Sequence, residues 1–172
     1  YQAALEGVLE PVLLFSLNAP TGKTTAESLG NVDTALAELR KVDEALGEEL
    51  EFTPEGLAKR RRQDANVAAV ESKWEQIKEG APGAIQEQTT SLISDLRTMI
   101  THVGDTSNLI LDPDLDSYYL MDITLVAMPQ MQERLAQIGR EMAPLFSAEE
   151  LSLDQRISLA VHGALLEESD IA

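Results

Sequence analysis

Side chains that could recognise a charged ligand gather around one basic run in an otherwise acidic chain. Lys59, Arg60, Arg61 and Arg62 follow one another, whereas the chain carries 30 acids against 13 Lys and Arg, a net charge of −17. Four consecutive helical residues point to all sides, so at least one must approach a buried stripe. Because an inward guanidinium is costly without a partner, the run predicts a structural ion pair or an anion-binding group, unless it is merely solvated helix surface.

The elements that would position this run are helices. Apolar residues make up 44% of the chain and aromatic residues only 4%, and no stretch alternates in the manner of a strand. Apolar stripes separated by breakers predict six helices, at about residues 1–17, 24–47, 54–79, 84–111, 113–143 and 148–170. The predicted fold class is therefore all-α, an elongated antiparallel bundle with a four-helix core.

The chain is long enough for a single domain, 1–172, with a sizeable core. In this interpretation residues 54–172 form the main bundle. Residues 1–53, whose helices are shorter, form either a second stacked module or a joint.

Local signals fix several of these helix ends. Thr53 before Pro54 predicts an N-cap followed by proline at the first helical position. Ser147 with Glu150 predicts a capping box for the last helix. Pro129 lies inside an apolar stripe and should kink the fifth helix.

Two hairpins would bring the candidate binding residues into one cross-section. A turn at 80–83 places Arg60 beside the end of the fourth helix, and a turn at Asp112–Pro113 places Asp105 beside the start of the fifth. The predicted ligand-binding layer comprises Arg60, Gln63, His102, Asp105, Thr106, Tyr118, Tyr119 and Asp122. The alternative is a structural network, in which Arg60 pairs with Asp105 or Asp122 and only fixes helix register.

Other motifs are weak. The run 21–25 (TGKTT) resembles the end of a phosphate-binding loop but lacks the earlier glycine and a preceding strand, so a turn with a threonine N-cap is preferred. The aspartates at 112, 114 and 116 have the opening spacing of a calcium loop, yet position 117 is Ser and position 123 is Ile. No pair of His and Glu has metal-binding helical spacing, and no nucleophile pattern occurs, so we expect neither a metal, a cofactor nor catalysis.

Composition excludes further classes of function. An acidic chain is a poor nucleic-acid binder, because phosphate contacts need clustered Lys and Arg. The absence of cysteine excludes disulfides and Cys-based zinc sites. The longest apolar run, 8–17, contains Glu10 and Pro11 and is far shorter than the roughly 20 residues that cross a bilayer. Because the chain begins with Tyr1, we interpret it as a piece of a longer protein.

The 18 residues from Asp105 to Asp122, DTSNLILDPDLDSYYLMD, also have a family likeness. They resemble the SNL-x-LDPDLDSYYLMD segment in the extracytoplasmic sensor regions of bacterial transmembrane receptors, both chemotaxis receptors and sensor histidine kinases. The resemblance implies a periplasmic, all-helical, homodimeric domain between two transmembrane helices that this chain lacks. It also implies a cytoplasmic output module, a kinase or a chemotaxis signalling hairpin, and small-molecule ligands such as organic acids.

Two functional hypotheses remain at this point. The first is a periplasmic ligand-sensing domain without enzymatic activity of its own, in which a ligand shifts the equilibrium between two helix arrangements. The second is a cytoplasmic helical interaction domain, for example an adaptor or regulatory bundle, that binds a protein partner. A bundle enzyme with a carboxylate-bound metal needs Glu-x-x-His pairs, and the sequence has none.

Overall fold

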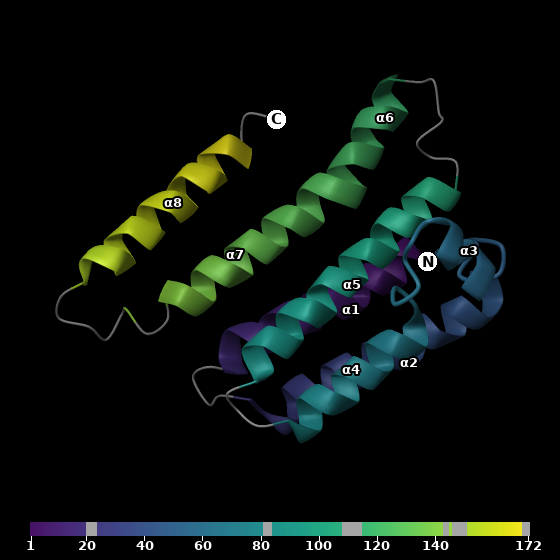
Figure 1. The fold of residues 1–172 in the computed structure, drawn as a ribbon, viewed down its shortest axis with the longest axis horizontal. Helices are drawn as coiled ribbons and strands as arrows, with labels where there is room; N and C mark the ends of the chain where they lie inside the picture. The colour runs from purple at the N-terminus through teal and green to yellow at the C-terminus, as the bar shows by residue number, and fades with distance from the viewer. Residues whose placement is uncertain (20–23, 81–83, 108–114, 143–144, 146–150, 170–172) are drawn as a thin grey trace.

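The protein is an all-α helical bundle (Figure 1), as the sequence predicts. The computed structural model describes residues 1–19, 24–80, 84–107, 115–142, 145 and 151–169, and no strand occurs among them. The helices are α1 (Gln2–Asn18), α2 (Ala26–Leu46), α3 (Pro54–Lys59), α4 (Val67–Glu79), α5 (Ile85–Thr106), α6 (Leu115–Asp122), the π-helical turn η3 (Ile123–Ala127), α7 (Met128–Met142) and α8 (Leu153–Ser169). None of these described helices combines the length and apolarity needed to cross a bilayer.

Four helices close into a ring around one core. Helix α1 packs against α2 and α5, and α4 packs against the same two helices from the other side. The largest fully buried side chains of the ring come from all four: Leu5, Leu9, Leu39, Trp74 and Leu96. Residues 1–53 thus supply two of the four ring helices, which differs from the expected joint or second module beside a main bundle.

Side-chain caps explain where these helices begin. The Thr25 hydroxyl accepts from the Ser28 N–H and the Ser28 hydroxyl accepts from the Thr25 N–H, each at 3.1 Å, which is a full capping box. At α3 the Thr53 hydroxyl accepts from the Gly56 N–H at 3.1 Å, with Pro54 next in the chain. The predicted threonine caps of both helices are confirmed.

The predicted continuous helix over 54–79 is wrong. Helix α3 ends at Lys59 and α4 begins only at Val67. Asn66 ends the interruption, because its side-chain oxygen accepts from the Ala69 N–H at 2.9 Å and so caps a new helix. Arg61 lies within the interruption at a left-handed φ of 56°, which no helix residue adopts.

The fifth predicted helix is also divided. It consists of α6, η3 and α7 in line, and the predicted Asp112–Pro113 turn lies outside the described residues. The kink predicted at Pro129 is not visible, since the three elements run in line; a π-helical turn lies before the proline instead, where the Met128 N–H donates to the Ile123 carbonyl. Proline cannot donate to the carbonyl four residues earlier, so a local change of helical spacing beside it follows.

Helix α7 is fastened to the ring at several levels. A Cβ on Gly104 of α5 would lie 2.7 Å from a side-chain methyl of Leu125 of η3, and one on Gly139 of α7 would lie 2.6 Å from a side-chain methyl of Leu17 of α1, so each leucine packs directly on the glycine of the neighbouring helix. Arg97 of α5 forms an ion pair with Glu133 of α7.

Helix α8 lies outermost and packs mainly against α7 (Figure 1). It begins later than predicted, with a capping box between Ser152 and Gln155 at 2.8 and 3.3 Å. The box predicted at Ser147 and Glu150 lies outside the described residues.

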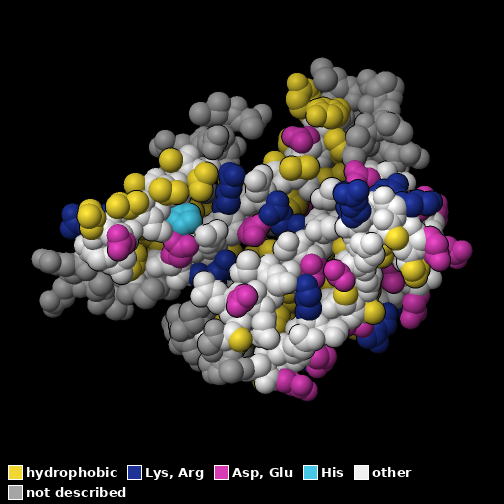
Figure 2. All heavy atoms as spheres, in the orientation of Figure 1, with side chains coloured by type: hydrophobic (Ala, Val, Ile, Leu, Met, Phe, Trp, Pro, Cys, Tyr) yellow, Lys and Arg dark blue, Asp and Glu magenta, His cyan; other side chains and the backbone are white. Residues whose placement is uncertain are grey.

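An apolar stripe on α8 faces outward. Leu153, Ile157 and Val161, which follow one another at helical spacing, are 72%, 53% and 52% exposed. Figure 2 shows apolar side chains along α8 and on α6 over the visible face. The stripe is exposed because α8 turns its other face, which carries Ser158 and His162, to α7.

Candidate functional site

The predicted layer around the basic run assembles differently from the expectation. Arg62, rather than Arg60, reaches α5, where its Nη1 lies 2.6 Å from Oδ2 of Asp105. Arg60 instead pairs with Glu51, just after α2. The difference follows from the break in the helix at residues 60–66. The prediction assumed that one continuous helix carries Arg60 on the same face as the buried residues of α4, and the break removes that alignment.

His102 lies at the centre of this region and is fully buried. Its Nε2 is 3.1 Å from the Leu50 carbonyl oxygen and 3.2 Å from the Glu51 carbonyl oxygen, so this nitrogen carries the proton and donates. The ring centroid of Phe52 lies 4.5 Å from that of His102, and Tyr1 stacks on Phe52 with the centroids also 4.5 Å apart.

Burial lowers the pKa of His102 below its usual value of 6.5. The hydrogen bonds to the two backbone carbonyls act in the opposite direction, and the positive charges of Arg60 and Arg62 again lower the pKa. The imidazole is therefore neutral at pH 7. It holds the α2–α3 connection against the end of α5.

That connection has a strained backbone. Glu51 adopts a left-handed φ of 55°, which turns its carbonyl toward His102. A Cβ on Gly56 would lie 2.3 Å from the same carbonyl oxygen, so only glycine fits there. These contacts favour the structural interpretation of the network, because its charged groups pair within the chain.

The remaining predicted site residues lie apart. The Thr106 hydroxyl donates to the His102 carbonyl at 2.7 Å, which is a local helix contact. Gln63 is exposed at the rim of a cavity of about 370 Å³ between the end of α2 and the start of α4. Tyr118, Tyr119 and Asp122 are exposed on α6, with the two tyrosine rings 6.0 Å apart. The eight residues do not share one cavity, since His102 is enclosed and the α6 residues lie on open surface.

A cleft between α7 and α8 is the feature that the sequence reasoning missed. It has a volume of about 490 Å³, which is in the range typical of small-molecule sites. Its described lining residues are Ile138, Glu141, Met142, Leu145, Gln155, Ser158, Leu159, His162 and Gly163.

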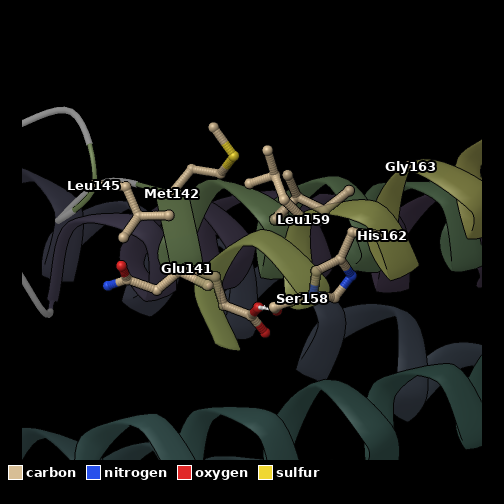
Figure 3. Close-up of a pocket in the computed structure, with 9 residues that line it drawn as sticks. Glu141, Met142, Leu145, Ser158, Leu159, His162 and Gly163 are labelled. Atoms are coloured by element: carbon tan, nitrogen blue, oxygen red, sulfur yellow. Dashed lines mark hydrogen bonds and ion pairs between the residues drawn. The ribbon is translucent and has the colours of Figure 1, made fainter. Parts of the chain in front are cut away.

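Glu141 is the polar centre of this cleft (Figure 3). Its Oε2 accepts from the Ser158 hydroxyl and from Nε2 of His162, both at 2.7 Å, so one carboxylate of α7 joins two residues one turn apart on α8. Its Oε1 accepts from Nε2 of Gln137 at 3.1 Å. The hydrogen bond from Ser158 is the largest effect that lowers the pKa of Glu141, and those from Gln137 and His162 add to it against partial burial. The carboxylate is therefore ionised at neutral pH.

The cleft is large enough to bind a small molecule, but its Ser and His side chains are not arranged for nucleophilic catalysis. Ser158 donates to Glu141 rather than to His162, so the histidine is not positioned to remove the hydroxyl proton. No group of three or more His, Cys, Asp or Glu side chains is placed to hold a metal ion in the described part of the chain.

The neighbouring cation of α7 points the other way. Nη1 of Arg140 donates to the Ser16 hydroxyl of α1 at 2.6 Å, and burial lowers the pKa of this arginine. Arg140 thus fastens α7 to the ring, while Glu141 faces α8.

The spacing of Ser158 and His162, four residues apart, could have indicated a shared polar face on the last helix. The sequence gives no sign that Glu141 faces them, because the register of α7 against α8 depends on residues 143–152, which carry no regular pattern.

Neither family models, curated proteins nor solved structures provide a match to this chain. Its function therefore has to be inferred from its own residues and geometry.

Proposed function

We propose that this chain is a ligand-sensing domain of a bacterial transmembrane receptor, acting on the periplasmic side, and that the α7–α8 cleft is its small-molecule site. The observation that carries the proposal is the cleft itself, with apolar walls and one hydrogen-bonded carboxylate at its centre. The resemblance of residues 105–122 to receptor sensor regions supports the same role. No catalytic step is part of the proposal.

The two walls of the cleft differ in a way that suits signalling. Helix α7 is held to the ring by the Arg97–Glu133 ion pair and the Arg140–Ser16 hydrogen bond. Helix α8 forms the other wall of the cleft and packs mainly against α7. A ligand that binds one spacing of α7 and α8 more tightly than another would shift α8 relative to a fixed bundle, by no more than its difference in binding free energy allows.

We further propose that the domain is a homodimer that pairs through the outward stripe Leu153, Ile157 and Val161 of α8. Three apolar residues four apart on one exposed helix face are the pattern by which helices pair. Pairing there would couple the position of α8 in one protomer to that in the other.

The proposal is tested by blocking the cleft. A thermal-shift screen of small amines, acids and neutral compounds should find at least one that stabilises the chain saturably, by about 2.7 kcal/mol at 100-fold its Kd. The variant Gly163→Leu should abolish the shift, because a Cβ at Gly163 meets nothing within 4 Å and the larger side chain fills the cleft without a backbone clash. If no compound binds, or if binding survives Gly163→Leu, the cleft is not the sensor site.

The exposed apolar stripe also favours a second candidate, a helical domain that binds a protein partner in the cytoplasm. The two candidates predict different sequences on either side of this segment in the encoding gene. The receptor predicts apolar spans of about 20 residues on both sides of this segment. The interaction domain predicts polar flanks.

A further inference from the structure

We infer that the ligand of the α7–α8 cleft is an organic amine, an ammonium group on a compact apolar body. The inference rests on the proposed function, which makes this cleft the ligand site, and it specifies the chemical class. It is opposite in charge to the organic acids that the family resemblance suggests.

The charge of the cleft points to a cation. Among its described lining residues Glu141 is the single acid and no Lys or Arg is present. Hydrogen bonds from Ser158, Gln137 and His162 keep the pKa of that carboxyl low, so the negative charge persists at neutral pH. The cation nearest in sequence, Arg140, interacts electrostatically with Glu141, but its guanidinium donates to Ser16 of α1 and it does not line the cleft.

The carboxylate also has room for one more donor. An ionised carboxylate has about four acceptor positions. Ser158 and His162 occupy Oε2, and Gln137 donates to Oε1. One position at Oε1 remains for an ammonium N–H, and the Glu141 side chain is 38% exposed, so it is reachable from the cleft.

The walls specify the rest of the ligand. Ile138, Met142, Leu145 and Leu159 line the same cleft with aliphatic side chains (Figure 3 labels the last three). A volume of about 490 Å³ accommodates a body larger than methylammonium. Burying a carbon chain against these residues adds hydrophobic stabilisation to the charge contact. A carboxylic acid of equal size would bury the same chain but place its anion beside Glu141.

The test compares three probes that differ only in the head group: hexylamine, hexanol and hexanoate, measured by isothermal titration calorimetry with the wild-type chain. We expect hexylamine to bind at least tenfold more tightly than hexanol, and hexanoate more weakly than both. Methylammonium at equal concentration controls for general attraction to a chain of charge −17 and should show no saturable binding.

Glu141→Gln keeps the shape and should reduce the amine affinity to that of hexanol. Glu44→Gln removes an exposed acid on α2, away from the cleft, and should change nothing. Each variant is checked for an unchanged helical circular dichroism spectrum. Should Glu141→Gln fail to fold, the wild-type ranking of the three probes still decides the question.

The outcomes separate the two proposals. Equal or tighter binding of hexanoate, or an amine preference that persists in Glu141→Gln, overturns the amine assignment. If hexanol or hexanoate binds and Gly163→Leu abolishes that binding, the cleft remains the ligand site and only the chemical class is wrong. If none of the three probes binds, the amine assignment fails, and the proposed function then depends on the wider screen.

Discussion

Protonation of His102 would place a charge in an enclosed site beside Arg60 and Arg62. Its pKa is lower in the folded chain than the 6.5 of an exposed histidine. Between these two values the unfolded chain binds more protons, so stability rises with pH and is lost as pH falls below about 6.5. A single group of this kind contributes at most about 1.4 kcal/mol per pH unit.

We therefore predict that the free energy of unfolding, measured by urea titration, decreases from pH 7 to pH 5, and that His102→Gln removes most of this slope. Glutamine can still donate an N–H to the Leu50 or Glu51 carbonyl. Ser94→Ala, at an exposed position of α5 without a titratable group, serves as the control and should retain the slope. An unchanged slope in His102→Gln would show that His102 does not control it.

Gly56 gives a second prediction at this scale. Gly56→Ala should destabilise the chain by about 1–3 kcal/mol, because its Cβ would overlap the Glu51 carbonyl that accepts from His102. Gly30→Ala in α2 is the control, since a Cβ there meets nothing within 4 Å, and it should be neutral or stabilise by up to about 1 kcal/mol. Equal effects of both substitutions in urea unfolding would contradict the described packing.

At the scale of elements, apolar periodicity and capping residues were sufficient to predict a helix and its first residue where the helix has a single apolar face. On α4, for example, Trp74 lies on the apolar stripe and is fully buried, with its Nε1 donating to Asp33 at 2.7 Å. The threonine caps of α2 and α3 also follow from the sequence. The break between α3 and α4 does not, because residues 59–64 are all polar and contain no proline or glycine, so the sequence there is compatible with a continuous exposed helix.

The candidate site was less predictable than the fold. Placing Arg60 against Asp105 required an unbroken helix, and the interruption exchanges Arg60 for Arg62. For α8 the apolar residues occupy two faces, so periodicity alone could not tell which face meets α7. The cleft lies on the face that carries Ser158 and His162.

The outward face of α8 yields a prediction on association. In sedimentation equilibrium the wild-type chain should dimerise, more strongly at higher salt because screening reduces the repulsion between two chains of charge −17. Ile157→Glu should give a monomer with unchanged helix content. Ser94→Glu on the exposed side of α5 adds the same charge and should leave the dimer intact. A dimer that survives Ile157→Glu would place the interface elsewhere.

At the scale of the whole molecule, four helices form a ring, a layer of α6, η3 and α7 is fastened to it, and α8 lies outermost (Figure 1). Under the proposed function, the ring stays fixed and a ligand in the cleft biases the position of α8. Shifts of about 1–2 Å between packed helices are sufficient for signalling in helical receptors and assemblies. If ligand binding moves α8 relative to the ring, the cleft is a sensor site. If α8 does not move, the cleft is only a binding site.

The most direct test measures that movement by pulsed electron spin resonance between paired spin labels, which the cysteine-free chain permits. One pair joins Ser94→Cys on α5 to Ala160→Cys on α8, and a reference pair joins Ser94→Cys to Glu44→Cys within the ring. With saturating hexylamine the account predicts a shift or narrowing of the α5–α8 distance distribution and no change in the reference pair. An unchanged α5–α8 distribution, or equal changes in both pairs, would contradict it.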